Sequence, residues 1–302
     1  MMAAVPHGIE YPFLFYLLSS IDFADFVQSG AVPSINQSQI SGIQIDLPPK
    51  PEQTKIAEIL STVDWAIEQT EALIAKQQRI KTGLMQDLLT RGIDEHGNLR
   101  SEQTHQFKDS PLGRIPVEWE VKPADALCNA VIDCKNRTPP AANEGHPVIR
   151  TPNVRNGEFV FNDLAYTDPV SYGIWVARGK PKPGDVVITR EAPFGEACLI
   201  PKSLDAPCLG QRIMMYQPNI SKLRPDYMVY AICSEALQTK LLELAGGSTV
   251  GHIRVGDIRE FPIPHPKSVE EQRLIAETLS AEATLINKFE DIAKNCVHLK
   301  SP

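Results

Sequence analysis

The stretch PPKPEQTKIAEILSTVDWAIEQTEALIAKQQRIKTGLMQDLL (residues 48–89) decides the fold. Its apolar or small residues recur at alternating intervals of four and three, which is the spacing of a coiled-coil seam rather than of a helix on a globular core. The seam comprises Ile56, Leu60, Val63, Ile67, Thr70, Ile74, Gln77, Lys81, Leu84 and Leu88. Its two polar members, Gln77 and Lys81, weaken the pairing but help to fix its register. The sequence therefore predicts one long helix that needs a second helix as its partner.

Both ends of this helix carry sequence signals. Pro48, Pro49 and Pro51 lie ahead of it, where the chain is extended or at a helix's first position. Gly92 follows Arg91, as a C-terminal cap would. A helix of roughly 38 residues would be ~57 Å long at ~1.5 Å per residue, longer than a typical domain helix. We therefore interpret it as a spacer.

The segments around this helix recur once, near the other end of the chain. IQIDLPPKPEQTKIAEILS (residues 43–61) resembles FPIPHPKSVEEQRLIAETLS (residues 261–280), so that Glu52-Gln53 matches Glu271-Gln272. Upstream, FLFYLLSS (residues 13–20) parallels YMVYAICS (residues 227–234), and INQSQI (residues 35–40) parallels IRVGDI (residues 253–258). Such self-similarity indicates two copies of one unit, which ends with an apolar helix, a polar loop, a short strand, a Pro-rich turn and a long helix. The first copy lacks the front half.

Length and composition limit the possible classes of protein. A chain of 302 residues with 42% hydrophobic residues allows about two domains. The six cysteines have neither C-x-x-C nor zinc spacing, so we expect buried thiols in a reducing cytosol and no metal. The longest apolar run, Phe13 to Leu18, is far shorter than the ~20 residues of a membrane helix, and no signal peptide is visible. A cytoplasmic protein is expected.

The formal net charge of −7 argues against a broadly basic nucleic-acid coat. It is compatible with binding of nucleic acid in a local groove.

In chain order, we expect a helix over residues 11–27, a polar loop over 30–41 and a short strand over 43–47. A polar linker or extended crossing segment over 92–111 precedes a second globular unit over 112–266. That unit has a helical pattern over 227–245, and a second, shorter long helix follows over 267–302. The strands expected in that unit are residues 130–133, 147–150, 185–189, 197–201 and 212–217. The predicted domains are thus residues 1–47, 48–91, 92–111, 112–266 and 267–302.

The second globular unit resembles a known family. LGRIPVEWEV (residues 112–121), VIRTPNVRNGEF (148–159), KPGDVVITREAPFGEACLIP (182–201), LGQRIMMYQP (209–218) and the FPIPHP…EEQRLIAETL junction are similar to one target-recognition domain of a type I restriction–modification specificity subunit. The earlier IDLPPKPEQTKIAEIL block resembles that family's central helical region. The resemblance implies an α+β fold, in which globular recognition domains with short strands are held apart by two long helices that form an antiparallel coiled coil.

The same resemblance implies a function. Each recognition domain of such a subunit binds one half of a split site in double-stranded DNA, and the helices hold methyltransferase subunits that modify adenine and, through them, restriction subunits. This chain departs from the pattern because only the C-terminal part of a first recognition domain (residues 1–47) is present. Either it is a half-subunit that pairs with a second copy and recognises a palindrome, or it is a truncated product with one working domain.

The candidates for DNA contact are polar side chains on loops, because Arg pairs bidentately with guanine, and Asn or Gln with adenine. These candidates are Lys135, Asn136, Arg137, Arg150, Asn153, Arg155, Arg190, Gln211, Arg212, Ser248, Thr249, His252 and Arg254. Each taken alone fits a solvated or structural role better, whereas for the set the resemblance implies that at least a few contact DNA. Arg178, Lys180 and Lys182 suit phosphate contacts better, although Lys182-Pro183-Gly184-Asp185 also fits an ordinary turn.

Catalytic motifs are missing from the sequence. The tetrapeptide Thr138-Pro139-Pro140-Ala141 lacks both ends of the acidic or Asn-Pro-Pro-aromatic motif of amino-methyltransferases, and there is no G-x-x-x-x-G-K-[ST] loop. Asp185, Glu191 and Lys202 fit a nuclease set poorly, since such residues beside strands are usually turn and surface residues. We therefore expect a non-catalytic DNA-recognition subunit without a cofactor. The alternative is a coiled-coil scaffold or decoy that binds methyltransferase subunits without recognising DNA.

One aromatic residue lies beside the seam of the first long helix. Trp65, two positions past the seam residue Val63, either packs against the recognition domain or contacts a methyltransferase subunit. The charged outer face of this helix is expected to be solvated or to contact a partner.

Overall fold

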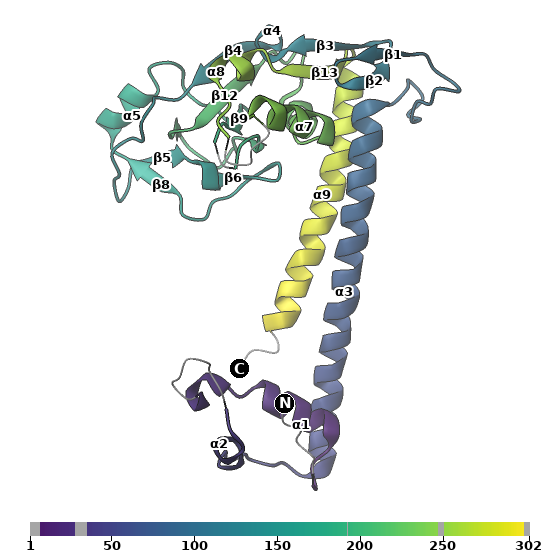
Figure 1. Cartoon of the computed structure of the whole chain (residues 1–302), viewed down its shortest axis with the longest axis vertical. Coiled ribbons are helices and arrows are strands. Elements are labelled where there is room, and N and C mark those ends of the chain that lie inside the picture. The colour runs from purple at the N-terminus through teal and green to yellow at the C-terminus, as the bar shows by residue number, and fades with distance from the viewer. Residues whose placement is uncertain (1–6, 28–34, 192, 247–250, 299–302) are drawn as a thin grey trace. The chain divides into compact units, whose positions relative to one another are not determined.

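The computed structural model describes residues 7–27, 35–191, 193–246 and 251–298. The chain divides into two compact units (Figure 1). The first unit consists of Met1–Gln78 with Leu285–Pro302, and the second of Arg79–Thr284. No helix among the described residues is long and apolar enough to cross a bilayer.

Two long helices, α3 (Lys50–Thr90) and α9 (Val269–His298), are the longest elements. Every residue of the predicted seam of α3 is partly or fully buried, and so is a matching seam on α9 with the same spacing. The α9 seam consists of Ile275, Leu279, Glu282, Ile286, Phe289, Ala293 and Cys296. Within the second unit, the first turn of α9 meets the segment that follows α3, so the two helices run in opposite chain directions there (Figure 1). The predicted α+β class with two long helices is confirmed.

The caps of α3 follow from its sequence. Pro49 and Pro51 flank the first helical residue, Lys50, and the carbonyl of Pro49 accepts the N–H of Gln53 at 3.0 Å. Gly92 has a φ of +65° just beyond the last turn, as a glycine cap requires. A Cβ at this position would collide with the side chains of Trp119, Arg100 and Glu271, so only glycine fits.

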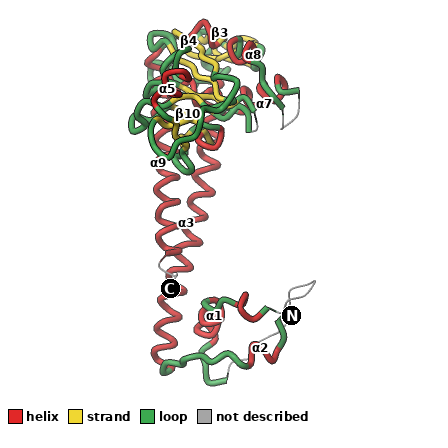
Figure 2. Tube along the Cα trace, turned by 90° about the vertical axis from the view of Figure 1, so that its left-hand side faces the viewer, coloured by secondary structure: helices red, strands yellow, loops and turns green. Residues whose placement is uncertain are grey.

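The second unit is built on short strands (Figure 2). A four-stranded sheet has the order β10-β9-β12-β4, a three-stranded sheet the order β11-β5-β8, and three antiparallel pairs join β1 to β2, β3 to β13 and β6 to β7. The strands are β1 (Phe107–Ser110), β2 (Gly113–Pro116), β3 (Trp119–Pro123), β4 (Cys128–Asp133), β5 (His146–Ile149), β6 (Val154–Arg155), β7 (Glu158–Phe159), β8 (Ala165–Thr167), β9 (Val186–Thr189), β10 (Ala197–Leu199), β11 (Cys208–Leu209), β12 (Ile213–Pro218) and β13 (Pro262–Pro266). The five strands predicted from the sequence correspond to β4, β5, β9, β10 and β12.

Shorter helices complete both units. They are α1 (Tyr11–Ser19), η1 (Phe23–Phe26) and α2 (Gln37–Ser41) in the first unit, and α4 (Ala124–Leu127), η2 (Thr151–Asn153), α5 (Pro169–Trp175), α6 (Pro225–Ile232), α7 (Glu235–Leu244) and α8 (Val255–Arg259) in the second. Two helices predicted as continuous are broken. Ser234 caps α7, because its Oγ accepts the N–H of Leu237, and Asp22 caps η1 by accepting the N–H of Ala24.

Two connecting segments bear on the sequence analysis. In the segment predicted as a linker, Ile93 and Arg100 are buried and β1 lies at its end. Residues 43–47 form no strand in the described structure, so the prediction of a strand there is wrong. Its counterpart β13 pairs with β3, and the described part of the first unit contains no strand that could do the same.

The core of the second unit joins its sheets to the long helices. Leu88 and Leu89 of α3 and Ile275, Ala276 and Leu279 of α9 belong to the same buried cluster as the β-strand residues Val186, Ile188, Met214 and Tyr216. This packing fixes the four-stranded sheet and its loops relative to the adjoining ends of both helices.

Candidate nucleic-acid interface

Three strands of the four-stranded sheet place their polar loops at one edge. β12 pairs antiparallel with both β4 and β9, with Ile213 opposite Thr189 and Met214 opposite Asp133. The ends of β4 and β9 therefore lie beside the start of β12. The loops that follow or precede these strands carry the predicted contacts Lys135–Arg137, Arg190 and Gln211-Arg212. The fold thus brings together candidates that are distant in sequence.

Arg190 ties a fourth loop to this edge. Its Nη1 donates to Asp133 Oδ1 at 2.9 Å, its Nε donates to the carbonyl of Ile253 at 3.0 Å, and its Nη2 lies 2.9 Å from Nε2 of His252. The side chain is almost fully buried, so these bonds exchange little with water. Arg190 therefore holds the loop that contains His252 against the sheet.

Glu191 forms a second link at the same edge. Its Oε1 lies 3.0 Å from Nδ1 of His252, and its Oε2 accepts from Nε of Arg212 at 2.5 Å. Arg212 is exposed and has a φ of +74°, a backbone conformation that is uncommon for a residue with a Cβ. The ion pair and the strained backbone fix the position of the exposed Arg212 guanidinium at the surface.

A tryptophan that sequence analysis did not single out supports the loop after β4. Lys135 Nζ lies 5.2 Å and Arg137 Cζ 5.4 Å from the ring centroid of Trp175 in α5, so both cations face its π-system. The indole Nε1 also donates to the carbonyl of Arg137 at 3.2 Å. No sequence signal links Trp175 to this loop, because the two segments are joined only by the fold.

Some predicted contacts are buried and serve the fold instead. Asn153 is fully buried; its Nδ2 donates to the carbonyls of Val160 and Asn162, and its Oδ1 accepts the N–H of Arg150. Asn153 and Arg190 have no polar atom free at the surface, which assigns both a structural role and removes them as candidates for base contact.

Arg150 and Arg155 also hold local loops. The guanidinium of Arg150 donates to the carbonyl of Asp163, and Nη1 of Arg155 donates to the carbonyls of Thr151 and Val154 at 2.6 and 2.7 Å. Both side chains remain partly exposed. They are therefore weaker candidates than the exposed cations.

The remaining candidates lie at the surface or outside the described residues. Asn136, Arg137, Arg212, His252 and Arg254 are exposed and Gln211 is half-buried, whereas Ser248 and Thr249 fall outside the described residues. The Asp257 carboxylate accepts two hydrogen bonds from Arg254 and raises the pKa of that guanidinium. Arg254 is therefore an exposed cation with an acidic neighbour in the adjoining short helix α8.

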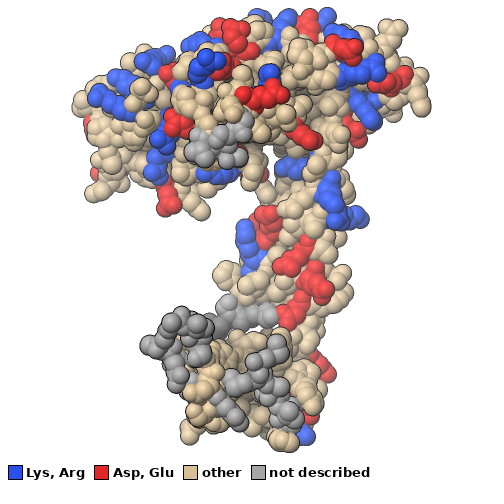
Figure 3. Space-filling model, in the orientation of Figure 1, with Lys and Arg blue, Asp and Glu red and all other residues tan. Residues whose placement is uncertain are grey.

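The cations proposed for phosphate contact differ from one another. Arg178 is 58% exposed, and its Nη1 donates to the carbonyl of Cys134 at 3.0 Å. Lys182 lies in a turn, since its N–H donates to Oδ2 of Asp185 and Gly184 has a φ of +88°. Lys and Arg side chains gather on the end of the second unit that carries α5 (Figure 3). The turn at residues 182–185 accounts for the Lys182-Pro183-Gly184-Asp185 sequence without a role in DNA binding.

The edge is poorly equipped for nucleophilic chemistry. Burial raises the pKa of the Cys134 thiol, which keeps it protonated at neutral pH. His252 has its two ring nitrogens within 3.0 Å of Arg190 and Glu191, and no described serine or cysteine hydrogen-bonds to it. This arrangement positions charge and hydrogen-bonding groups at a surface.

Comparison with known families identifies the fold. Residues 3–77 and 116–294 match the family described as the type I restriction modification DNA specificity domain. The chain belongs to this family. The resemblance found in the sequence motifs is thereby confirmed.

Curated specificity subunits are similar to this family member over most of its length. A putative type I restriction enzyme specificity subunit, MjaX of Methanocaldococcus jannaschii, is 30% identical over 92% of this chain and 62% of its own length. The MjaVIII specificity subunit of the same organism is 28% identical over 84% of this chain and 59% of its own length. The chain therefore spans about 60% of the length of these relatives.

Solved structures share the fold of this specificity-domain chain. The S subunit of a type I restriction–modification system from M. genitalium has a TM-score of 0.61 at 15% identity, covering 97% of this chain and 71% of the other. The HsdS subunit from Thermoanaerobacter tengcongensis has a TM-score of 0.51 at 19% identity, covering 96% and 67%.

Proposed function

We propose that this chain is a sequence-specific DNA-recognition component of a type I restriction–modification complex and that it has no catalytic activity of its own. The observation that carries the proposal is the sheet edge of the second unit, where loops from β4, β9 and β12 and the loop at His252 present exposed cations and amides on a rigid frame. Membership of the type I restriction modification DNA specificity family supports DNA as the ligand of this edge.

The exposed residues of this edge suit different parts of a duplex. Arg137 and Arg212 have the planar guanidinium that pairs bidentately with guanine, and Asn136 and Gln211 have amides that match adenine. Lys135, Arg178 and Arg254 suit phosphate contacts, which position the protein without reading sequence. The net charge of −7 confines the DNA to this local basic surface.

A partner surface is proposed on α3 within the first unit. Ile59, Trp65 and Leu73 are 55%, 63% and 42% exposed, although large apolar side chains are usually covered. The exposure of Trp65 supports contact with a methyltransferase subunit, because no side chain of the described first unit covers its indole. We propose that methyltransferase subunits bind here, modify adenine, and bring restriction subunits to the site in the cytoplasm.

Fluorescence anisotropy with labelled duplexes of randomised sequence, measured between about 50 and 200 mM salt, tests DNA recognition. A chain that neutralises several phosphates loses on the order of 10²-fold or more in affinity over this range. Arg137→Ala with Arg212→Ala should weaken binding, whereas Lys240→Ala, a change of a half-buried cation on α7, should not. Absence of salt-dependent binding, together with stable capture of a methyltransferase subunit, would support the scaffold or decoy instead.

Self-pairing of two copies is a further part of this proposal. Two chains related by a two-fold axis would present identical recognition surfaces and select a palindromic site. Solution mass of the complex, measured by light scattering at working concentration, separates one copy from two.

A further inference from the structure

The guanidinium of Arg212, at the start of β12, is engaged on one side and open on the other. Its Nε lies 2.5 Å from Oε2 of Glu191, and no described residue hydrogen-bonds to its Nη1 or Nη2. A guanidinium offers paired N–H groups at two edges, Nε–Nη2 and Nη1–Nη2. Because the carboxylate of Glu191 occupies the Nε side, the Nη1–Nη2 edge of Arg212 is the pair left for a ligand.

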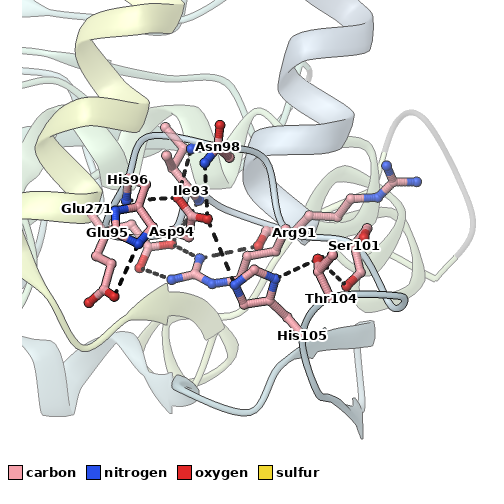
Figure 4. A network of polar contacts seen from close by, with 11 residues as sticks. Arg91, Ile93, Asp94, Glu95, His96, Asn98, Ser101, Thr104, His105 and Glu271 are labelled. Atoms are coloured by element: carbon pink, nitrogen blue, oxygen red, sulfur yellow. Dashed lines mark hydrogen bonds and ion pairs between the residues drawn. The ribbon is translucent and has the colours of Figure 1, made fainter.

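The buried Arg100 is the contrasting case. It donates from Nη1 and Nη2 to the two carboxylate oxygens of Glu271, at 2.5 and 3.1 Å, within a polar network of the second unit (Figure 4). The Nη1–Nη2 edge of Arg100 is therefore filled by a protein acceptor. A carboxylate placed there gives an arginine a structural role, whereas a carboxylate on the Nε side leaves the arginine able to bind a second acceptor.

The backbone around Arg212 is held on both sides. Its carbonyl accepts the N–H of Arg190 at 2.9 Å, and the N–H of Gly210 donates to the carbonyl of Ile149 at 2.8 Å. A Cβ at Gly210 would lie 2.7 Å from that carbonyl oxygen, so this close approach requires glycine. Together with the φ of +74°, these contacts fix the direction in which the Arg212 side chain leaves the backbone.

Glu191 is held in place by a second partner. Its Oε1 lies 3.0 Å from Nδ1 of His252, whose Nε2 lies 2.9 Å from Nη2 of the almost fully buried Arg190. Since a guanidinium nitrogen can only donate, Nε2 of His252 accepts, and its Nδ1 carries the proton that is donated to Glu191. The carboxylate thus serves His252 with one oxygen and Arg212 with the other.

We propose that Glu191 is a positioning residue for base recognition, which holds Arg212 so that its Nη1–Nη2 edge binds N7 and O6 of one guanine in the major groove. This inference rests on the proposed recognition of DNA by the sheet edge. Glu191 was not among the candidates for DNA contact in the sequence, because a carboxylate repels phosphates and its role follows only from its contacts.

The charge of Glu191 has a second effect on binding. It compensates the charge of Arg212, so the pair adds little to the general attraction of phosphates. Neutralising Glu191 should therefore strengthen binding to unrelated sequences while it weakens the preference for guanine. A residue needed only for folding would not change these two quantities in opposite directions.

Selection by the full chain from duplexes with a randomised central segment first defines the preferred motif. Each guanine of that motif is then replaced in turn by 7-deazaguanine, which lacks the N7 acceptor, and the affinity is measured by fluorescence anisotropy. The wild-type chain should lose about tenfold in affinity at one guanine. Arg212→Lys keeps the positive charge but lacks the planar fork, so it should be insensitive to the replacement at that guanine.

Glu191→Gln tests the positioning role. A glutamine amide has one oxygen and one NH₂ group, so it cannot accept from both Arg212 and His252. This variant should lose the sensitivity to 7-deazaguanine at the same position, while its affinity for duplexes without the motif should rise about twofold or more. Asp257→Asn removes one charge beside Arg254 and is the matched control. It should raise the affinity for unrelated duplexes similarly and leave the sensitivity unchanged.

The combination of Glu191→Gln with Arg212→Lys shows whether Glu191 acts through Arg212. The double variant should prefer the motif over unrelated duplexes as much as Arg212→Lys alone, and additive losses would overturn the proposal. A motif without a sensitive guanine, or retained sensitivity in Glu191→Gln, would also overturn it while leaving DNA recognition intact. A wild-type chain that selects no motif would instead contradict DNA recognition itself, and the positioning role with it.

Discussion

At the scale of single residues, the buried pair Arg100–Glu271 joins the end of α3, β3 and α9. Both side chains are about one-tenth exposed, so loss of one partner leaves the other charged and buried. Glu271→Gln should lower the free energy of unfolding of the second unit by about 3–5 kcal/mol. Urea denaturation measures this. Glu52→Gln, at the exposed equivalent position, is the matched control and should change it by less than about 0.5 kcal/mol. Equal effects of the two substitutions on the free energy of unfolding would contradict a stabilising role of the Arg100–Glu271 pair.

His265 in β13 makes the stability depend on pH. Burial lowers the pKa of this imidazole below its ordinary value of 6.5, although its Nδ1–H donates to the carbonyl of Ile263 at 3.0 Å. Because the unfolded chain binds the proton more tightly, the stabilising effect of the neutral form is complete above about pH 6.5 and is lost as the pH falls below that value. Urea titrations at a series of pH values should show this loss, and His265→Gln should reduce the slope. A slope that the substitution leaves unchanged would exclude His265 as its cause.

Asn153 and Arg137 were equivalent candidates in the sequence, and the structure separates them. Residue type identifies groups able to contact bases, but orientation depends on contacts made by distant segments, such as Trp175 beneath Arg137. Arg137→Ala should weaken DNA binding with little change in stability. Asn153→Ala should instead cost about 1–3 kcal/mol of unfolding free energy, because it leaves buried backbone groups without partners. Fluorescence anisotropy and urea denaturation on both variants test this. Unchanged DNA binding by Arg137→Ala, or unchanged stability of Asn153→Ala, would refute it.

At the scale of elements, the long helices could be predicted because their pattern is local. The intervals of four and three identify the seam of α3, and prolines and Gly92 mark its ends. The short strands β6, β7 and β11 were missed because two residues carry no periodic signal and are defined only by their partners. The predicted strand over residues 43–47 failed for the same reason: its sequence favours an extended segment, but no described neighbour pairs with it.

The exposed face of α3 leads to a prediction about partner binding. Trp65→Ala should reduce co-purification of a methyltransferase subunit while changing the free energy of unfolding by less than about 0.5 kcal/mol, because the side chain is 63% exposed. Trp119→Ala is the contrasting variant. The Trp119 indole is fully buried, so its loss should lower the free energy of unfolding by about 3–5 kcal/mol. Loss of stability in Trp65→Ala would indicate that this tryptophan packs within the protein.

At the scale of the whole molecule, the repeat organises the chain. The sequence shows two copies through matches such as Glu52-Gln53 with Glu271-Gln272. It does not show that Glu271 pairs with Arg100 and Trp119, because these two residues lie far from either copy of the motif. Likewise, the gathering of four loops at one sheet edge depends on strand register, which no local motif encodes.

We propose above all that the sheet edge of the second unit recognises DNA for a partner methyltransferase. Co-expression of the chain with a methyltransferase subunit, followed by mapping of methylated adenines on plasmid DNA, tests it most directly. We expect methylation at one defined motif, and loss or relaxation of that motif when Arg137→Ala and Arg212→Ala are combined. Methylation that the double substitution leaves unchanged, or a stable complex that leaves the DNA unmodified, would contradict the claim.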